Sequence, residues 1–287
     1  MIPAAIGAAL RAARGRLAQA LVLEPSVAGL EAQILLGHVL GHPRAYLLAH
    51  PEAALSGVNQ TQFEALLARR ERGEPIAYII GQREFYGLAF LVTPDVLIPR
   101  PETELLIDLA LEQIPQDATT HVLDLGTGSG AIAITLAKLR PRAQVTAVEA
   151  SPQALAIARQ NASRLGATNI TFIESNWFAG LSESSRFELI VANPPYVAEN
   201  DPHLNHGDVR FEPINALTSG QDGLDAIRLI AQTSPGFLQA SGRLLFEHGY
   251  DQGGVSKAIL HSLGYNDIVA YPDLGGRPRV TGGRKPH

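Results

Sequence analysis

Cysteine is absent from this sequence, and methionine and tryptophan occur once each among its 287 residues. Without cysteine, the chain has no disulfide bond, no thiolate nucleophile and no cysteine-ligated zinc site. The sequence also lacks any apolar run of the roughly 18 residues that a membrane-spanning helix needs. These absences suit a reducing compartment, so we expect a cytoplasmic protein without a membrane partner.

A basic excess is missing as well. The sequence has 23 Lys and Arg against 28 Asp and Glu, a formal net charge of −5. Proteins that bind nucleic acids usually carry a basic surplus or stripe, so we expect no nucleic-acid partner, although these totals do not exclude a local basic face. Apolar residues make up 46% of the chain, enough for a sizeable core, and the length suits two domains. No segment has the pattern of an apolar interaction helix, so we expect a monomer.

Residues 1–73 have the pattern of an all-helical domain, with helices expected over about 4–22, 26–41 and 61–73. The start is rich in alanine and carries arginine, as transit peptides do. Apolar residues at helical spacing favour a folded amphipathic helix instead: Ile6, Leu10, Leu17 and Leu21. The third helix ends in Arg69, Arg70 and Arg72, for which we favour a solvated helix end over a binding patch.

A linker of different character follows over residues 74–100. It is rich in β-branched and aromatic residues, and Tyr86-Gly87 divides it with a turn signal. This pattern predicts a β-hairpin between two domains. Pro101 then fits the first turn of a new helix. Glu102 and Glu104 favour the N-terminus of this helix, because acidic side chains interact well with its dipole.

Residues 101–287 form the second predicted domain, in which strands and helices alternate. Strands are expected at 121–125, 143–150, 170–173, 187–193 and 242–248, from 267 onward, and near 279–281. Helices are expected at 129–139, 151–165, 222–233 and 252–263, with a long polar loop at 194–220. This alternation predicts an α/β fold, in which helices cover both faces of a parallel sheet.

A glycine-rich loop connects the first of these strands to its helix. Its residues are Gly126, Thr127, Gly128, Ser129 and Gly130. Glycines allow a sharp turn and a close approach to a ligand, and the helix N-terminus offers free N–H groups. Glu149 ends the next strand, where a carboxylate can accept hydrogen bonds from both hydroxyls of a ribose. The loop therefore predicts an adenosine-type nucleotide, but it also fits a nicotinamide dinucleotide and does not say which is bound.

The sequence Asn193-Pro194-Pro195-Tyr196 follows the fourth predicted strand, which should lie beside the first. These four residues, the NPPY loop, therefore face the same crevice as the glycine loop. Two prolines stiffen the loop and remove two N–H donors. Asn193 Oδ1 and the Pro194 carbonyl can then accept both N–H bonds of a planar –NH2 group and stabilise positive charge on its nitrogen. Tyr196 can lie on the flat face of that group.

Methyl transfer to a conjugated nitrogen fits such a site, because it needs positioning and desolvation rather than a metal or a strong base. The sequence has no H-E-x-x-H pattern, and we expect no metal. Three alternatives stay open: an adenine-N6 methyltransferase, a nicotinamide-dependent oxidoreductase and a nucleotide-binding regulatory module. The net charge argues against the first, and the lack of a Tyr-x-x-x-Lys pair after the fourth strand argues against the second. The NPPY loop argues against the third.

Seven stretches are specific in combination. They are PIAYIIGQREFYG at 75–87, LIPRPETE at 97–104, DLGTGSGAIAI at 124–134, NWF at 176–178, NPPY at 193–196, DPHLNHGDVRFEP at 201–213 and LLFEHG at 244–249. Through them the chain resembles the PrmC/HemK family, the N5-glutamine methyltransferases that modify the Gly-Gly-Gln glutamine of class I peptide-chain release factors. NPPY also occurs in adenine-N6 methyltransferases, and the DVRFEP and IPRPETE stretches narrow the resemblance.

The resemblance implies a class I (Rossmann-like) methyltransferase domain, a helical substrate-docking domain and a hairpin linker. It implies S-adenosyl-L-methionine as cofactor, S-adenosyl-L-homocysteine as product and class I release factors as partners. The family's cofactor residues carry over to Gly126, Thr127, Gly128, Ser129, Gly130, Glu149, Trp177 and Asn193, with Trp177 stacked near the adenine. Its glutamine-binding residues carry over to Asn193, Pro194, Pro195 and Tyr196, of which Asn193, Pro194 and Tyr196 would be catalytic.

Two positions depart from the residues usual in this family. Asn176 stands where relatives often have Asp, which accepts a hydrogen bond from the adenine amino group. The Asn oxygen can still accept, so we expect weakened rather than lost cofactor binding. Glu149 stands where many relatives have Asp, and a side chain longer by one methylene should be tolerated.

Several charged residues near these stretches have more than one expected role. Asp124 either orients the glycine loop or contacts the cofactor. Arg100 either closes over the cofactor or lies on the surface, and for Glu247 and His248 we favour a structural role. Asp208, Arg210 and Glu212 either shape the acceptor channel or pair with one another.

Overall fold

The computed structural model describes residues 5–286, which form two compact units. Unit 1 comprises the chain up to Gly81 together with Asn205–Phe211. Unit 2 comprises Gln82–Leu204 and the chain from Glu212 onward. The polypeptide therefore contributes to unit 1 twice, once at its start and once within the long loop after the NPPY residues.

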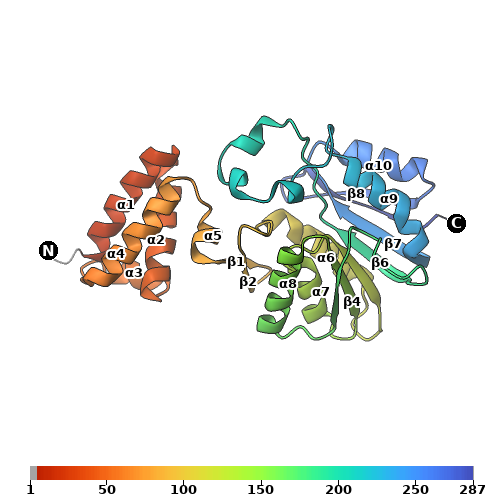
Figure 1. The fold of residues 1–287 in the computed structure, drawn as a ribbon, viewed down its shortest axis with the longest axis horizontal. Helices are drawn as coiled ribbons and strands as arrows, with labels where there is room; N and C mark the ends of the chain where they lie inside the picture. The colour runs from red at the N-terminus through yellow and green to blue at the C-terminus, as the bar shows by residue number, and fades with distance from the viewer. Residues whose placement is uncertain (1–4, 287) are drawn as a thin grey trace. The chain divides into compact units, whose positions relative to one another are not determined.

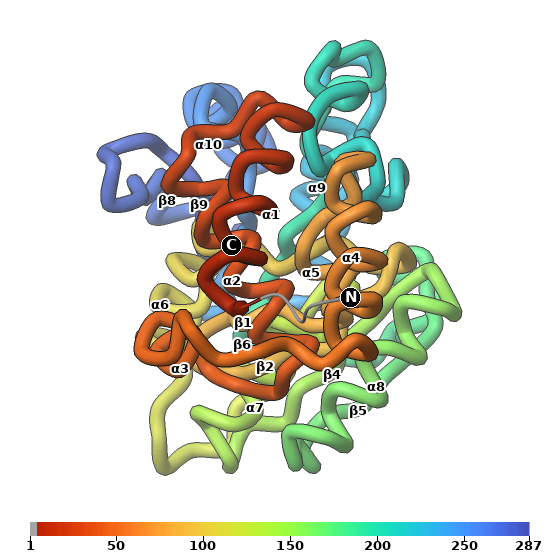
Figure 2. The backbone as a smooth tube through the Cα atoms, turned by 90° about the vertical axis from the view of Figure 1, so that its left-hand side faces the viewer, coloured from red at the N-terminus to blue at the C-terminus, as the bar shows by residue number. Residues whose placement is uncertain are grey.

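Within the described residues, unit 1 contains five α-helices. They are α1 (Ile6–Leu21), α2 (Pro25–Leu40), α3 (Arg44–Ala49), α4 (Gly57–Glu71) and α5 (Ile76–Ile80). Helices α1, α2 and α4 pack against one another (Figures 1 and 2) around a core that includes Leu17, Leu35 and Phe63. The Ser56 hydroxyl caps α4 by accepting a hydrogen bond from the Asn59 N–H. The start of the helix expected over 4–22 lies partly outside the described residues.

Helix α5 corrects the sequence-based prediction, which assigned residues 74–100 to a β-hairpin linker. Its isoleucines Ile76, Ile79 and Ile80 pack on the core of unit 1, and their i, i+3, i+4 spacing is helical. Pro75 precedes the first turn, and Gly81 ends the helix with a φ of 72°. Packing on one face therefore overrides the β-propensity of isoleucine here. Helix α3 was also missed, because six residues are too few for a clear period.

A hairpin begins unit 2, formed by strands β1 (Gln82–Phe85) and β2 (Leu88–Leu91). Tyr86 and Gly87 make the turn, as predicted, with φ values of 51° and 73°. Two positive φ values match the right-handed twist of the paired strands. Phe85 and Phe90 are buried in the core of unit 2, so the hairpin belongs to that core.

The described part of unit 2 contains a seven-stranded sheet in the order β5-β4-β3-β6-β7-β9-β8. Its strands are β3 (His121–Leu125), β4 (Gln144–Glu149), β5 (Ile170–Glu174), β6 (Phe187–Ala192), β7 (Leu238–Glu247), β8 (Asn266–Pro272) and β9 (Pro278–Arg284). Strands β3 to β7 pair in parallel, whereas β9 is antiparallel to both its neighbours. The predicted α/β fold is confirmed, and the strand expected near 279–281 is β9, but its antiparallel pairing was not predicted.

Helices cover both faces of this sheet (Figure 1). Helices α6 (Glu104–Gln113), α7 (Ala131–Leu139) and α8 (Pro152–Leu165) cover one face, and α9 (Asp225–Phe237) and α10 (Gly253–Ser262) cover the other. Side chains alternate between the two faces along strand β6. Leu189 and Val191 pack in the core under α6, α7 and α8, whereas Ile190 and Ala192 pack in the core under α9 and α10. No helix of the described residues is long and apolar enough to cross a membrane.

The glycine loop and the NPPY loop meet because of the strand order. Strand β3 lies between β4 and β6, and Leu125 at its end pairs with Ala192 at the end of β6. The prediction that the fourth strand lies beside the first is therefore confirmed. At such a switch point, the loops after neighbouring strands diverge and leave a crevice at the carboxyl ends of the strands.

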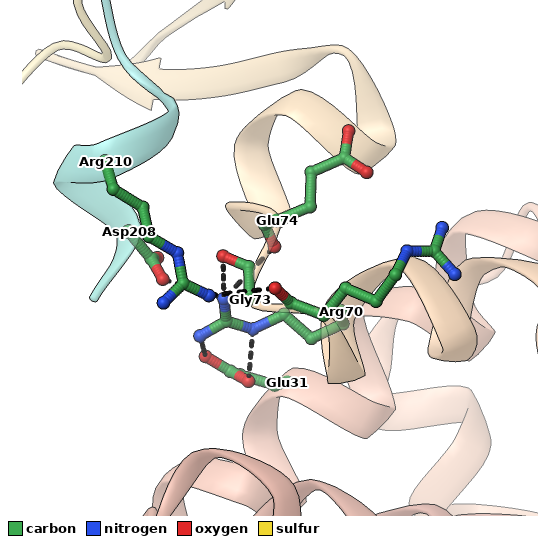
Figure 3. Close-up of polar contacts among 7 residues, drawn as sticks. Glu31, Arg70, Gly73, Glu74, Asp208 and Arg210 are labelled. Carbon is green, nitrogen blue, oxygen red and sulfur yellow. Dashed lines mark hydrogen bonds and ion pairs between the residues drawn. The ribbon is translucent and has the colours of Figure 1, made fainter. Parts of the chain in front are cut away.

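Residues 205–211 are held in unit 1 by Arg70 (Figure 3). This side chain is only 4% exposed. Its Nε and Nη2 each donate to a carboxylate oxygen of Glu31 at 2.9 Å, and its Nη1 donates to Asp208 Oδ1 at 2.7 Å. Such a forked pair fits the planar guanidinium well. Arg70 is thus a buried structural cation, and the expected solvated helix end is wrong for this residue.

Arg210 lies on the same segment and also bonds to the helical part of unit 1 (Figure 3). Its Nη2 donates to the carbonyl oxygen of Arg72 at 2.8 Å. Asp208 therefore bonds to the end of α4, and Arg210 bonds to the residue that follows this helix. The expectation that Asp208, Arg210 and Glu212 pair with one another is wrong, because Glu212 pairs with Arg100 in unit 2.

Candidate cofactor and acceptor site

A cavity of about 430 Å³ lies in unit 2 beyond the carboxyl ends of β3, β4 and β6. This volume is within the roughly 300–1,000 Å³ usual for small-molecule sites. The predicted site residues that line it are Gly126, Gly128, Glu149, Trp177, Asn193 and Pro195. The other predicted site residues do not line this cavity: Thr127, Ser129, Gly130, Pro194 and Tyr196. The glycine loop and the NPPY loop therefore reach the same cavity, and each contributes only some of its residues to the lining.

The glycine loop has a backbone that favours glycine at three positions. Gly126, Gly128 and Gly130 have φ values of 72°, 56° and 84°. A Cβ atom on Gly130 would lie 2.6 Å from Ile134 Cδ1, and one on Gly126 would lie 3.4 Å from the Trp177 ring. Side chains at these positions would therefore strain the loop or crowd the cavity wall.

Asp124 lies beneath the glycine loop and is fully buried. Its Oδ2 accepts hydrogen bonds from Thr127 Oγ1 at 2.6 Å and from the Ala133 N–H at 3.2 Å. Burial raises the pKa of Asp124 to about 7, against the opposing effect of these two hydrogen bonds. Of the two roles left open by the sequence, these contacts support orientation of the loop.

Glu149 is held in place by the backbone on either side of it. Its Oε2 accepts from the Gly128 N–H at 2.9 Å, and its Oε1 accepts from the Ser151 N–H at 3.0 Å. A carboxylate oxygen can accept a second hydrogen bond. Glu149 thus lines the cavity in a fixed orientation and keeps capacity for two hydroxyl donors.

Trp177 and Asn176 form the wall next to the glycine loop. Trp177 has a φ of 52°, a left-handed conformation that is strained in a residue with a side chain. Ser175 stabilises this turn, because its hydroxyl donates to the Trp177 carbonyl at 2.7 Å and accepts from the Gly180 N–H at 2.8 Å. Strain of this kind is common at ligand sites. Asn176 is exposed, so its amide is accessible from the cavity.

The NPPY loop is hydrogen-bonded to three residues outside it. Asn193 Nδ2 donates to Thr103 Oγ1 at 3.1 Å, which leaves Asn193 Oδ1 available as an acceptor. The Tyr196 hydroxyl donates to Glu247 Oε1 at 3.3 Å, and its carbonyl accepts from Gln252 Nε2 at 3.0 Å. Burial and the nearby Glu247 charge raise the pKa of Tyr196, so its phenol stays protonated. Sequence reasoning missed Thr103, for which the LIPRPETE stretch was the only signal.

Arg100 secures the chain where it returns to unit 2 after residue 211. Its guanidinium pairs with Glu212, whose side chain is fully buried. Glu212 Oε2 also accepts from the Ile98 N–H at 3.0 Å. The residues that follow, Pro213 and Asn215, line the cavity. Arg100 therefore fixes one wall of the cavity through Glu212.

The contacts of His248 support the structural role expected for this residue. Its Nδ1 lies 2.8 Å from the Gly249 carbonyl oxygen, and its Nε2 lies 2.8 Å from Thr281 Oγ1. A carbonyl oxygen only accepts, so Nδ1 carries the proton and Nε2 accepts from the threonine. Burial lowers the pKa of His248, which keeps the ring neutral. No group of three or more His, Asp or Glu suited to a metal ion occurs in residues 5–286.

Comparisons with known proteins agree with this architecture. The PrmC N-terminal domain family matches residues 8–81, and the methyltransferase small domain family matches residues 103–210. A methyltransferase from Pyrococcus furiosus shares the fold with a TM-score of 0.52 at 17% identity, over 77% of this chain and 98% of that one. The 16S rRNA methyltransferase RsmC of T. thermophilus, solved with S-adenosylmethionine and guanosine, has a TM-score of 0.52 at 20% identity, over 71% and 49% of the two chains.

The sheet order, the glycine loop with its acidic partner and the NPPY loop together define an S-adenosylmethionine-dependent methyltransferase. Within that class, the release factor glutamine methyltransferase of Vibrio cholerae is 49% identical over 97% of this chain and 96% of its own length. The enzyme of the same name from Escherichia coli is 44% identical over 88% and 91%. The chain belongs to the release factor glutamine methyltransferase family.

Proposed function

We propose that this protein transfers a methyl group from S-adenosyl-L-methionine to the side-chain amide nitrogen (N5) of the glutamine in the Gly-Gly-Gln motif of class I peptide-chain release factors. One observation carries the proposal. Asn193 uses its amide nitrogen on Thr103, so its Oδ1 stays available to accept from an amide N–H in the cavity that Glu149 also lines. The names of the relatives support the choice of release factor and glutamine.

The residues of the cavity suit the cofactor. Glu149 would accept hydrogen bonds from the ribose hydroxyls, and the close backbone approach at Gly126 and Gly128 would admit the nucleoside. Trp177 would stack on the adenine, and the Asn176 oxygen would accept from the adenine amino group. When bound, S-adenosylmethionine supplies an electrophilic methyl group on its sulfonium sulfur.

The NPPY loop would activate the acceptor by orientation. The lone pair of an amide nitrogen is delocalised into the carbonyl, so the nitrogen is a weak nucleophile. Asn193 Oδ1 and the Pro194 carbonyl oxygen would accept its two N–H bonds and stabilise the positive charge that develops as the new C–N bond forms. One of these protons then leaves to solvent, and the product amide keeps the other. The prolines hold both acceptors rigid, so little reorganisation accompanies the transfer.

The chain regions take the roles that the family resemblance implies. We propose residues 1–73, together with α5, as the docking domain for the release factor, the rest of 74–100 as the segment that joins it to the methyltransferase domain, and 101–287 as the methyltransferase domain. Docking away from the reacting nitrogen would let the enzyme distinguish this glutamine from free glutamine, because binding energy from remote contacts is used to position the acceptor.

The test is methyl transfer with labelled S-adenosylmethionine and three separate acceptors: unmethylated release factor, the same factor with Asn in place of the Gly-Gly-Gln glutamine, and DNA. Peptide mass spectrometry locates the label. We expect it on that glutamine alone, with a loss of about 10²–10³-fold in kcat/KM for Asn193→Ala. Asn266→Ala, an asparagine of β8 outside the cavity lining, is the matched control. Label on DNA, or none on the glutamine, would contradict the proposal.

A further inference from the structure

Two buried residues outside the NPPY loop contact its polar side chains. Thr103, 4% exposed, ends the 3₁₀ turn Pro101–Thr103 before α6, and Glu247, 1% exposed, ends β7. Thr103 Oγ1 accepts from Asn193 Nδ2 at 3.1 Å, and Glu247 Oε1 accepts from the Tyr196 hydroxyl at 3.3 Å. The Thr103 hydroxyl also lies close enough to Glu247 to lower the pKa of its carboxyl group. The four side chains thus form one polar chain, in which two hydrogen bonds are linked by the approach of the Thr103 hydroxyl to the Glu247 carboxylate.

The negative charge of Glu247 decides which of these side chains donate and which accept hydrogen bonds. An ionised carboxylate only accepts hydrogen bonds, so the nearby Thr103 hydroxyl is best oriented with its single proton toward Glu247. Toward Asn193 the same hydroxyl can then only accept, and it takes the Nδ2–H. If the Asn193 amide turned over, its Oδ1 would face an oxygen with no proton to offer, and the Nδ2–H bonds would face the N–H bonds of the acceptor.

We infer that Thr103 and Glu247 are positioning residues, which hold the Asn193 amide so that its Oδ1 accepts from the nitrogen to be methylated. The inference rests on the proposed function, since it requires Asn193 to bind the acceptor amide. Thr103 and Glu247 come from the start of a helix and the end of a strand, and such rigid elements hold a site more closely than loops do. The Glu247 carboxylate also fixes the last residue of the NPPY loop, because it accepts a hydrogen bond from the Tyr196 hydroxyl.

The surroundings of Glu247 place its titration close to neutral pH. Burial raises its pKa to about 7, against the hydrogen bonds from Thr103 and Tyr196 and the charge of Arg279 on β9. The charge of Glu102 adds to the increase. Glu247 Oε2 is buried without a well-formed hydrogen bond to a described residue, which fits a carboxylate that is costly to ionise. A protonated Glu247 can donate to Thr103, and the direction of the chain is then no longer fixed.

The first test compares Thr103→Val, which keeps the shape and removes the hydroxyl, with Thr103→Ser, which keeps the hydroxyl. Methylation of the release factor is measured at saturating cofactor, together with cofactor Kd and Tm. We expect Thr103→Val to lower kcat about 10- to 100-fold, less than the roughly 10²–10³-fold loss from removing a direct contact. Thr103→Ser should recover most of kcat. Thr135→Val, a buried threonine of α7 whose hydroxyl has no partner among the described residues, is the matched control.

The second test is the pH profile of kcat, which a merely structural role would not alter. The wild-type kcat should fall as the pH drops below about 7. In Glu247→Gln this decrease should disappear, because the side chain cannot titrate. A Thr103→Val variant with wild-type kcat, or an unchanged acid limb in Glu247→Gln, overturns the inference and leaves the proposed function standing. If the wild-type protein transfers no methyl group to the glutamine, both the inference and the proposed function are wrong.

Discussion

Arg70 and Asp208 are 138 positions apart in the sequence, and their side chains form an ion pair of 2.7 Å. The two ends of this pair differ in environment, since Arg70 is 4% exposed and the Asp208 side chain is 45% exposed. Arg70 also binds Glu31, which is 14% exposed. The inner half of this cluster is therefore desolvated, whereas the outer half is in contact with water.

Removing the two partners should have unequal effects on stability. Arg70→Met leaves the Glu31 carboxylate without its cation, and we expect the free energy of unfolding to fall by about 3–5 kcal/mol. Asp208→Asn removes a half-exposed partner, and we expect a loss of no more than about 1 kcal/mol. Urea denaturation measures both. Arg228→Met, from an exposed pair with Asp222, is the control. Equal losses from Arg70→Met and Asp208→Asn would contradict this account.

Two glycine-to-alanine variants should change stability in opposite directions. Gly130 has a φ of 84°, and its new Cβ would lie 2.6 Å from Ile134, so Gly130→Ala should cost about 1–3 kcal/mol and weaken cofactor binding. Gly236 lies in α9 with nothing within 4 Å of a built Cβ, so Gly236→Ala should stabilise by up to about 1 kcal/mol. Thermal unfolding and calorimetry test both effects. An unaffected Gly130→Ala would show that the loop tolerates a side chain.

Cofactor binding should be visible in tryptophan fluorescence. Trp177 is the only tryptophan of the chain, and it lines the cavity beside Gly126. We expect its emission to change on titration with S-adenosylmethionine. Trp177→Phe should keep an aromatic face while removing the signal, and should weaken binding up to about tenfold, measured by calorimetry. Binding without any change in wild-type emission would place the adenine elsewhere.

The asparagine at position 176 gives a gain-of-affinity test. A carboxylate accepts a stronger hydrogen bond from an amino group than an amide oxygen does. We therefore expect Asn176→Asp to lower the Kd for S-adenosylmethionine a few-fold, about 2- to 5-fold given the exposure of the residue. Asn176→Ala should raise the Kd. If Asp and Ala substitutions leave the Kd the same, residue 176 does not contact the adenine.

The stability contributed by Asp124 should depend on pH. Its pKa is raised from 3.8 to about 7 by burial, so between these values the folded state holds a proton that the unfolded state has released. The stability linked to this proton is fully present below pH 3.8 and is lost as the pH rises through about 7. Asp124→Asn cannot titrate, so its stability relative to wild type should increase from pH 5 to pH 8. Urea denaturation across this range tests it, and a constant difference would contradict the raised pKa.

Local patterns were sufficient for much of the fold. Apolar runs and glycine signals located the strands of the sheet, and the Tyr86-Gly87 turn was placed correctly because Gly87 adopts a positive φ without strain. The pattern failed where the segment was short. Helix α5 has five residues, and its isoleucines also suit a strand, so only contact with the core of unit 1 decides between the two.

The sequence by itself determined the local chemistry of this protein: a glycine loop, an acidic residue about 20 positions later and the NPPY loop, each built from neighbouring residues. The tertiary structure alone decided which distant residues support them. Asn193 meets Thr103 across 90 positions, and Arg70 meets Asp208 across 138. Hydrogen bonds need their partners within about 3 Å, and only the packing of strands and helices sets distances between segments so far apart. Neither a threonine before a helix nor an arginine at the end of another shows from its neighbours in the sequence which distant residue it will bind.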